Sequence, residues 1–256
     1  MAPLQARKEY KHHLRLRDAP CQQAGGRRDS DDRAEREEED SEAYGKGDGN
    51  RERHRGPQQP VRIMIVRKFS GFCNAYLIGD ILIDAPYGTQ LPEAQTVIIT
   101  HEHCDHFAGL GALAGSKAAS EFCANVVNGK EEEFGLCRGL NMEFPEAEVE
   151  RVLNDGEVVG GDGFGLKVFH TPGHAKGAIC LYEPDKKLLF SGDTVFPDGG
   201  LPNCALPSSE PAKLIESYER LASLDVKGIF SGHGEEEKEK NYISRMLRML
   251  KSDNPY

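Results

Sequence analysis

The chain has 256 residues, with 32 Lys and Arg against 42 Asp and Glu, which gives a formal net charge of −10. A chain of this length holds one or two domains, and its acidic balance disfavours nucleic-acid partners, whose phosphates require a basic protein face. No segment approaches the roughly 18 apolar residues of a membrane span or contains the apolar core of a signal peptide, so we expect no membrane partner.

The N-terminal segment differs in composition from the rest of the chain. Among Leu, Ile, Val and Phe, residues 1–60 contain only Leu4, Leu14 and Leu16, and they carry 13 basic and 13 acidic residues. A segment of this kind cannot bury an apolar core. We therefore predict a disordered mixed-charge tail over residues 1–58 and a single folded domain over residues 59–256, which carries the whole net charge.

Apolar runs and turn residues predict the elements of the folded domain in chain order. Strands are predicted over 61–69, 74–78, 81–84 and 97–100. Helices follow over 107–114 and 121–127, and the acidic stretch 131–150 is predicted to be irregular.

The second half of the domain repeats the pattern of strands followed by helices. Strands are predicted over 166–169, 178–182, 188–190 and 228–231. Helices are predicted over 211–222 and 235–251, the latter with acidic residues in its first turn. The element order indicates an α/β (α+β) protein, a four-layer αββα sandwich with the candidate ligands on loops along one edge.

The strongest chemical signal follows the strand predicted over 97–100. Residues 101–106 read His-Glu-His-Cys-Asp-His, which places four metal-binding side chains within six residues: His101, His103, Asp105 and His106. Alternate side chains of an extended backbone share a face, so the first two can meet one ion and the last two, past the turn, a second. Imidazole and carboxylate suit zinc, and also iron or manganese.

Three later residues belong to the same pattern. His174, Asp193 and His233 each lie at a Gly-containing turn after an apolar segment. One such turn is usually only a turn, but loops at strand ends are where functional side chains are found. Together with the motif at 101–106 they make four strand-end positions with metal-binding groups, which indicates a shared metal site.

These motifs resemble those of the metallo-β-lactamase-fold hydrolase superfamily, in its glyoxalase II-like branch, over about residues 61–251. The family has a His-x-His-x-Asp-His motif followed by a third-motif His, a bridging Asp and a final His, and every one of these positions is filled here. The resemblance implies two divalent metal ions per chain, with zinc as the expected metal and iron or manganese as alternatives. It also implies a first metal held by His101, His103 and His174, a second held by Asp105, His106 and His233, and Asp193 bridging both.

The same resemblance assigns a supporting role to Asp84, which matches the family's strand-end Asp behind the ligand histidines. Such partners fix the orientation and basicity of a ligand imidazole. An alternative is that Asp84 only starts the Ala85-Pro86 turn. The remaining histidine of the domain, His170, is interpreted as a strand residue packed near the site.

The seven cysteines are odd in number, widely scattered and without a Cys-x-x-Cys pair. This pattern predicts neither a zinc ribbon nor a disulfide framework, and it favours reduced thiols in the cytoplasm. Cys104 lies inside the histidine motif and is expected to be a neighbour of the metals, not a ligand.

The ligand set predicts a metal-dependent hydrolase in which a bridging hydroxide attacks an acyl carbonyl. Asp105 is predicted to be catalytic, orienting the hydroxide and relaying a proton. A thiolate leaves without much protonation, so a small thioester is the preferred acyl substrate. Two departures from the glyoxalase II pattern put glutathione itself in doubt as the thiol. That enzyme adds a helical domain to hold glutathione, whereas this chain ends soon after His233. Many relatives also have Gly-Arg after the position that matches Gly200, and this chain does not.

Specificity is predicted to come from the acidic stretch 131–150 and the loop 196–209 at the rim of the site. The candidates for holding an acyl group or its carboxylate are Phe134, Arg138 and Phe144, although packing would also explain the two phenylalanines. Alternatives to a thioesterase are a mononuclear-iron persulfide dioxygenase-like enzyme, a lactonase or other ester hydrolase, a nuclease, and a non-catalytic metal-binding module. The sequence leaves the oligomeric state open.

Overall fold

The computed structural model describes residues 65–161, 163–236 and 241–253. The tail predicted over residues 1–58 and the first residues of the strand predicted over 61–69 lie outside the described part of the chain.

The first half of the described chain builds a six-stranded sheet with the strand order β1-β2-β3-β4-β5-β6. Strands β1 to β3 are antiparallel neighbours, and β3 to β6 are parallel neighbours. The strands are β1 (Val66–Ser70), β2 (Asn74–Ile78), β3 (Ile81–Ile83), β4 (Thr96–Ile98), β5 (Ser116–Ala119) and β6 (Arg151–Val152).

The second half builds a five-stranded sheet with the strand order β11-β10-β9-β8-β7. Its pairs are antiparallel except β10 and β11, which run parallel. The strands are β7 (Val158–Gly161), β8 (Phe164–His170), β9 (Ile179–Glu183), β10 (Leu188–Gly192) and β11 (Gly228–Ser231).

Alternation along the strands creates the layers, because successive side chains of a strand point to opposite faces. In β3, Ile81 and Ile83 join the apolar cluster between the two sheets, whereas Leu82 joins a cluster on the outer face of the first sheet. In β9, Leu181 faces the cluster between the sheets, and Cys180 faces the outer side of the second sheet.

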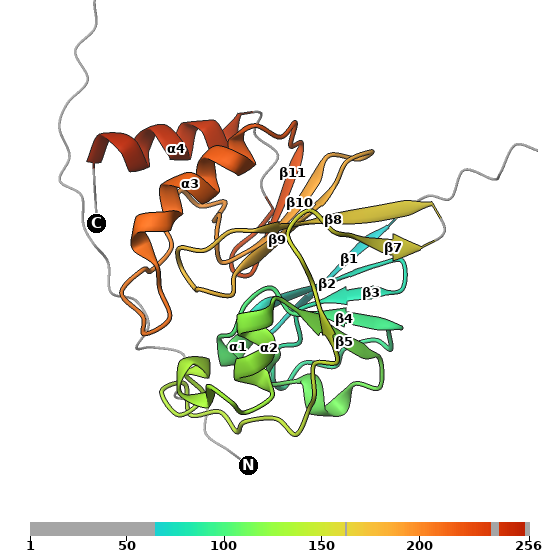
Figure 1. The fold of residues 1–256 in the computed structure, drawn as a ribbon. Helices are drawn as coiled ribbons and strands as arrows, with labels where there is room; N and C mark the ends of the chain where they lie inside the picture. Colours follow the sequence, from blue (N-terminus) through green and yellow to red (C-terminus); the bar gives the residue numbers. More distant parts are fainter. Residues whose placement is uncertain (1–64, 162, 237–240, 254–256) are drawn as a thin grey trace, which may run out of the picture. The chain divides into compact units, whose positions relative to one another are not determined.

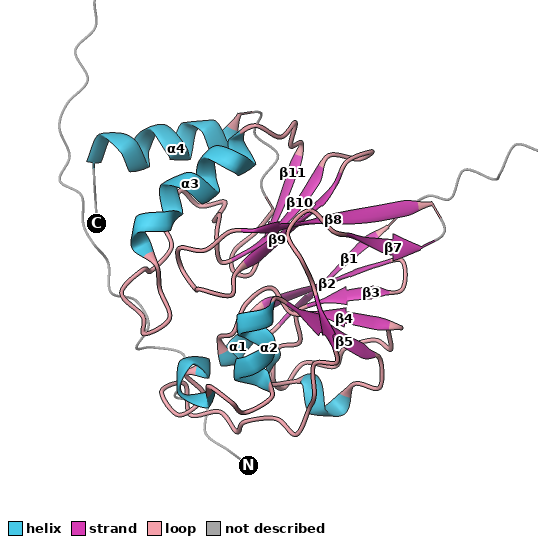
Figure 2. Cartoon of the chain, in the orientation of Figure 1, coloured by secondary structure: helices cyan, strands magenta, loops and turns pink. Residues whose placement is uncertain are grey.

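Helices cover both outer faces (Figure 1, Figure 2). On the first sheet lie α1 (Cys104–Phe107) and α2 (Glu121–Val127). Each is followed in the chain by a short 3-10 helix, α1 by η1 (Leu110–Ala112) and α2 by η2 (Glu132–Gly135). On the second sheet lie α3 (Pro211–Ala222) and α4 (Tyr242–Asp253), whose apolar faces pack in the third cluster. The observed layers are the predicted αββα sandwich. Among the described residues, no helix combines the length and apolar character needed to cross a bilayer.

Strand direction brings several loops to one edge. Strands β8, β10 and β11 run the same way, and so do β3 and β4, so within each sheet the carboxyl ends of these strands meet at one edge. Backbone hydrogen bonds join the two sheets there, from Asn74 N to Gly232 O at 2.6 Å and from Ile179 N to Thr100 O at 2.8 Å. The loops that carry the candidate ligands therefore share a single edge.

Three strands were missed by the sequence analysis. β5 reads Ser-Lys-Ala-Ala, β6 has two residues, and half of β7 is glycine, so none shows the β-branched or aromatic run that marks a strand. Their pairing with neighbouring strands, not their own composition, makes them strands.

Two predicted helices differ from the structure. The helix predicted over 107–114 is wrong: α1 ends at Phe107 because the chain turns at Gly109, whose N–H bonds to Ala85 O at 2.8 Å, before η1 begins. The helix predicted over 235–251 begins later, at Tyr242, and residues 235 and 236 are not helical, so α4 has no acidic residue in its first turn.

Candidate metal centre

The structure brings all seven predicted ligands together at the shared edge. The donor atoms of His101, His103 and His174 lie within 4.8 Å of one another. The same limit holds for His101, His106 and Asp193, and for Asp105, His106 and His233. These overlapping sets form one cluster, which we call the ligand cluster.

Close backbone approach at the last loop makes the cluster compact. Gly232 lies between β11 and His233, and a Cβ atom there would lie 2.3 Å from Asp193 Oδ1 and 2.4 Å from His106 Cε1. Only glycine leaves room for these two side chains. The Gly that the sequence analysis treated as a turn residue is therefore required by the site itself.

His101 and His106 each have a polar partner at the Nδ1 atom, on the side away from the cluster. Thr100 Oγ1 lies 3.2 Å from His101 Nδ1, and Asp84 Oδ2 lies 2.8 Å from His106 Nδ1. Asp84 also accepts hydrogen bonds from the backbone N–H and the hydroxyl of Thr100, at 2.8 and 2.9 Å. These contacts leave the Nε2 atom of each imidazole facing the cluster.

His103 and His174 are held by the loop 196–209. His174 Nδ1 donates to the Asn203 carbonyl at 2.8 Å, and Ser208 Oγ lies 3.4 Å from His103 Nε2. Their remaining nitrogens, His103 Nδ1 and His174 Nε2, face each other at 2.9 Å. Each imidazole thus has one outer partner and one nitrogen directed inward, as metal-binding histidines commonly have.

Three inward atoms have no hydrogen-bond partner within the described residues: His101 Nε2, His106 Nε2 and Asp193 Oδ1. Each is buried, and burying a polar atom without a partner costs on the order of 1 to 3 kcal/mol. Three such atoms facing one point are explained if a cation satisfies them. Neutral imidazoles and carboxylates are also the donors that zinc and other divalent metals prefer, so the residues present fit a metal.

Burial keeps the imidazoles of His101, His103 and His174 neutral. Burial lowers the pKa of His103 to about 3, helped by the charge of His174, and it also lowers the pKa values of His101 and His174. A neutral imidazole has a lone pair to give to a metal, whereas a protonated one has none. The three-histidine group is therefore ready to bind a cation at neutral pH.

The part of the cluster around Asp105, Asp193 and His233 contains two carboxylates. Burial acts to raise the pKa of Asp193, but the charges of His106 and His233 hold it well below its usual range. Burial acts to lower the pKa of His233, but the charge of Asp193 and the hydrogen bonds that the imidazole donates to both carboxylates raise it to about 9. Asp105 Oδ2 lies 3.3 Å from His233 Nε2. Ionised carboxylates that draw protons onto imidazoles will equally attract a divalent cation.

Cys73, Asp84 and His106 also bring donor atoms within 4.8 Å of one another. Both oxygens of Asp84 are already occupied by hydrogen bonds with Thr100 and His106. Burial raises the pKa of the Cys73 thiol to about 12, which disfavours the thiolate that a metal needs. We therefore interpret this group as the support of His106, not as a third ion site.

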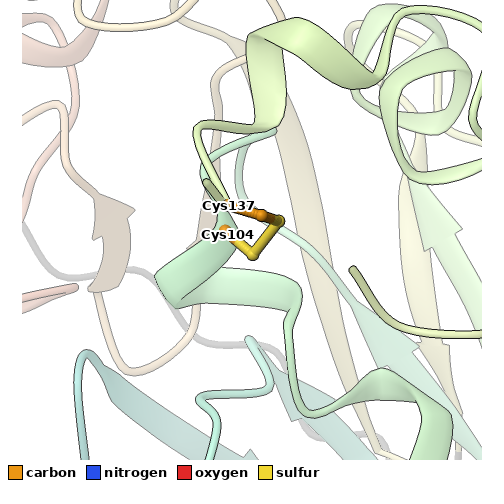
Figure 3. The surroundings of a disulfide bond; sticks show 2 residues. All are labelled: Cys104 and Cys137. Carbon is orange, nitrogen blue, oxygen red and sulfur yellow. A yellow bond between two sulfur atoms is a disulfide. The ribbon is translucent and has the colours of Figure 1, made fainter. Parts of the chain in front are cut away.

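A disulfide joins Cys104, inside the histidine motif, to Cys137 in the acidic stretch (Figure 3). The expectation of reduced thiols is wrong for this pair. Sequence spacing hid it, because the two cysteines are 33 residues apart and meet only when the stretch 131–150 folds back onto α1. The other four described cysteines are buried and form no disulfide.

The structure places the three rim candidates in different settings. The Phe144 ring packs on buried Phe107 at 5.5 Å between centroids, and the Phe134 ring contacts Phe122 at 5.6 Å. Arg138 follows the disulfide and lines a hollow of about 370 Å³ with Glu132 and Glu133 and with Leu136, Cys137 and Gly139. Its guanidinium forms no ion pair with a carboxylate of the described residues.

His170 is a strand residue, as predicted, and is the last residue of β8. Its Nε2 is 3.0 Å from the Leu153 carbonyl, and its backbone N–H donates to Asp155 at 2.8 Å. It therefore holds the turn between β6 and β7. Residues that the sequence analysis did not single out, Ser208 and Asn203, contact the histidines instead, and their local sequence gives no signal for this role.

The match to known families agrees with this geometry. The model of the metallo-beta-lactamase superfamily matches residues 70–233. The acyl-coenzyme A thioesterase MBLAC2 of Bos taurus is 34% identical over 156 residues, which cover 52% of this chain and 52% of that protein. A hydroxyacylglutathione hydrolase of Brucella ovis is 34% identical over 145 residues, covering 54% of this chain and 47% of that protein. The match thus spans about half the length of these relatives.

Solved structures agree on the fold. The metallo-beta-lactamase family protein TTHA1429 of Thermus thermophilus superposes with a TM-score of 0.60 at 20% identity, over 75% of this chain and 79% of that one. The BLEG-1 B3 metallo-beta-lactamase has a TM-score of 0.60 at 19% identity, over 75% and 98%. At these identities the likeness establishes the fold alone, and it confirms the predicted αββα class.

Proposed function

Because the chain belongs to the metallo-beta-lactamase superfamily, we propose that it is a metal-dependent hydrolase that cleaves a small acyl thioester at a dinuclear zinc centre. The observation that carries the proposal is the ligand cluster, in which three buried inward atoms have no hydrogen-bond partner among the described residues.

In this proposal one ion would be held by His101, His103 and His174 and a second by Asp105, His106 and His233, with Asp193 shared. Two bound divalent ions supply a water of lowered pKa and polarise the acyl carbonyl. Asp193 can serve both because it faces both halves: its Oδ2 lies 3.6 Å from His174 Nε2 and 3.4 Å from His233 Nε2.

Asp105 is proposed to move the proton. Its side chain is 18% exposed, against 9% for Asp193, so it lies nearer the open side of the cluster. Burial acts to raise the pKa of Asp105, but the charge of His106 and a hydrogen bond from His233 lower it. An ionised carboxylate at this position can accept a proton from the attacking water and deliver it to the leaving group.

A thioester fits best because of the leaving group and the relatives. A thiol has a pKa near 8.5, so a thiolate departs at neutral pH with little help from an acid. The relatives act on acyl-coenzyme A and on hydroxyacylglutathione by their names, and both are acyl groups carried on a thiol. Arg138, in the hollow beside the disulfide, is proposed to hold a carboxylate or phosphate of such a substrate.

The test is a substrate panel on zinc-, manganese- and iron-loaded protein. It comprises thioesters of glutathione, coenzyme A and N-acetylcysteamine together with lactones, phosphodiesters and β-lactams, each assayed beside Asp105→Asn. That variant keeps the side-chain volume but removes the proton acceptor. We expect kcat/KM to be highest for a thioester, and kcat to fall by about 10² or more in Asp105→Asn with at least one metal per chain retained.

Arg138→Ala, with Lys130→Ala as a nearby control, tests the rim. We expect Arg138→Ala to raise KM for anionic thioesters and to leave that for N-acetylcysteamine thioesters unchanged. Faster turnover of a lactone or phosphodiester than of any thioester would reject the proposed substrate class. Oxygen uptake by the iron form with a persulfide, in the absence of thioester hydrolysis, would favour an oxygenase instead.

A further inference from the structure

We infer that Glu102, the residue between the first two histidines, is a positioning residue that fixes the three-histidine group by joining it to the loop of His174. This inference rests on the proposed metal centre. Glu102 is fully buried. Its two carboxylate oxygens accept the backbone N–H of Gly177, at 3.3 and 3.1 Å. Because Gly177 lies three residues after His174, one side chain connects the two segments that supply His101, His103 and His174.

The fit at Gly177 is too close for another residue. A Cβ atom there would lie 2.6 Å from Glu102 Oε2, 2.8 Å from Cys123 N and 3.0 Å from Ser120 Oγ. Ser120, the N-cap of α2, donates its hydroxyl to the Gly177 carbonyl at 2.5 Å. Both polar groups of this peptide segment are therefore fixed, the N–H by Glu102 and the carbonyl by Ser120.

Glu102 also approaches the third segment around the histidines. The Ser208 hydroxyl lies 3.4 Å from His103 Nε2, and it acts against the burial that raises the pKa of the Glu102 carboxyl. The neighbouring Ser209 donates to the His174 carbonyl at 2.6 Å. Glu102 thus joins the histidine motif to the loop of His174, and Ser208 and Ser209 join the loop 196–209 to His103 and His174.

Loss of the carboxylate would leave the buried Gly177 N–H without its acceptor, so the loop should shift and take His174 with it. His103 Nδ1 and His174 Nε2 lie 2.9 Å apart, and a metal requires both at fixed positions. Changes in residues that orient metal ligands typically weaken metal binding by 10- to 100-fold.

The experiment measures zinc affinity of the metal-stripped full chain by competition with a chromophoric chelator, together with the visible spectrum of the cobalt form. Glu102→Gln keeps the volume and one acceptor oxygen, and Glu102→Ala removes both oxygens. Glu183 provides the matched control. It is 1% exposed, and its carboxylate accepts the Lys186 backbone N–H at 2.6 Å in the turn between β9 and β10.

We expect the affinity of the tighter zinc site to fall about threefold to tenfold in Glu102→Gln and 10- to 100-fold in Glu102→Ala, with an altered cobalt spectrum. Glu183→Gln and Glu183→Ala should lose thermal stability but keep wild-type affinity and spectrum. Equal losses of affinity in the Glu183 variants would show a general effect of destabilisation and overturn the inference.

Wild-type affinity in folded Glu102→Gln and Glu102→Ala would also overturn it, and if Glu102→Ala does not fold, unchanged affinity in Glu102→Gln is sufficient. A wild-type chain that binds no zinc would instead reject the metal centre itself, and the role of Glu102 with it. The first result leaves the proposed function standing and the second does not.

Discussion

At the scale of single residues, Asp193 and His233 should separate the two halves of the ligand cluster. Asp193 faces His106, His174 and His233. Asp193→Ala should therefore weaken both metals, whereas His233→Ala should empty mainly the second and leave the three-histidine group populated. Elemental analysis after dialysis measures this directly. Two metals per chain in both variants would show that the ligands are wrongly assigned.

The sequence predicted which residues form the cluster but not what holds them. The ligands are visible because His101 to His106 is a dense local motif and because each later ligand follows an apolar run at a glycine. Ser208 and Glu102 are not visible, since a serine or a glutamate gives no local signal of a contact made with a distant loop. Whether all seven residues bind metal remains a prediction.

At the scale of elements, the disulfide should stabilise the acidic stretch against α1. In the chain-entropy description, a loop of 15 residues contributes about 3 kcal/mol and one of 100 residues about 4.7 kcal/mol, and the present separation of 33 lies between them. Cys137→Ser should lower the free energy of unfolding by about 2 to 4 kcal/mol. Thermal unfolding of metal-free protein with and without a reductant measures this.

The reductant also provides the control for this prediction. It should lower the melting temperature of the wild type to that of Cys137→Ser and leave the variant unchanged. A stabilising bond would be contradicted by two results together. The wild type would melt at the same temperature with and without the reductant, and Cys137→Ser would melt no lower than the wild type.

A second prediction at this scale concerns the attachment of α3. Arg220 on α3 donates to both oxygens of Asp155, at 2.8 and 2.9 Å. Burial acts to raise the pKa of Asp155, but the hydrogen bond from Arg220 and that from the His170 backbone lower it. A carboxyl whose folded-state pKa is depressed stabilises the fold above its unfolded pKa of about 3.9, and this contribution is lost as the pH falls.

Asp155→Asn should therefore melt lower than the wild type at pH 7, by an amount that corresponds to about 1 kcal/mol or less, because the side chain is 46% exposed. The difference should shrink at pH 3. Asp185→Asn, at an exposed aspartate that makes no ion pair with a described residue, is the control. A gap that stays constant from pH 7 to pH 3 would exclude a charge-based contribution.

Local sequence patterns define some elements of the fold and miss others. α2 and α3 and strands β2 and β11 were predicted with their observed bounds, because their own apolar spacing or turn residues define them. β5 was missed because its Ser-Lys-Ala-Ala sequence becomes a strand only between β4 and β6. The Cys104 to Cys137 bond was missed for the same reason, since only the folded chain brings the two residues together.

At the scale of the whole molecule, two helix-covered sheets place the loops of one edge around a single cluster of ligands. Each sheet contributes one part of it: the histidine motif follows β4 of the first sheet, and the later ligands follow β8, β10 and β11 of the second. The hydrogen bond between Ile179 and Thr100 joins the two parts. Relative motion of the sheets would therefore disturb both halves of the cluster.

The apolar clusters that hold these layers are drawn from the described chain between Val66 and Leu250. Residues 1–58 lack the apolar content needed to offset the entropy of ordering them. We therefore expect a chain that begins at Gln59 to melt within a few degrees of the full-length protein, to bind the same amount of metal and to keep its kcat/KM. A chain that begins at Asn74 lacks β1, which pairs with β2 along its whole length, and should be unstable. Thermal unfolding, elemental analysis and thioester kinetics on the three chains decide the matter. Loss of most activity in the chain beginning at Gln59, with its metals still bound, would make the first 58 residues an integral part of the enzyme.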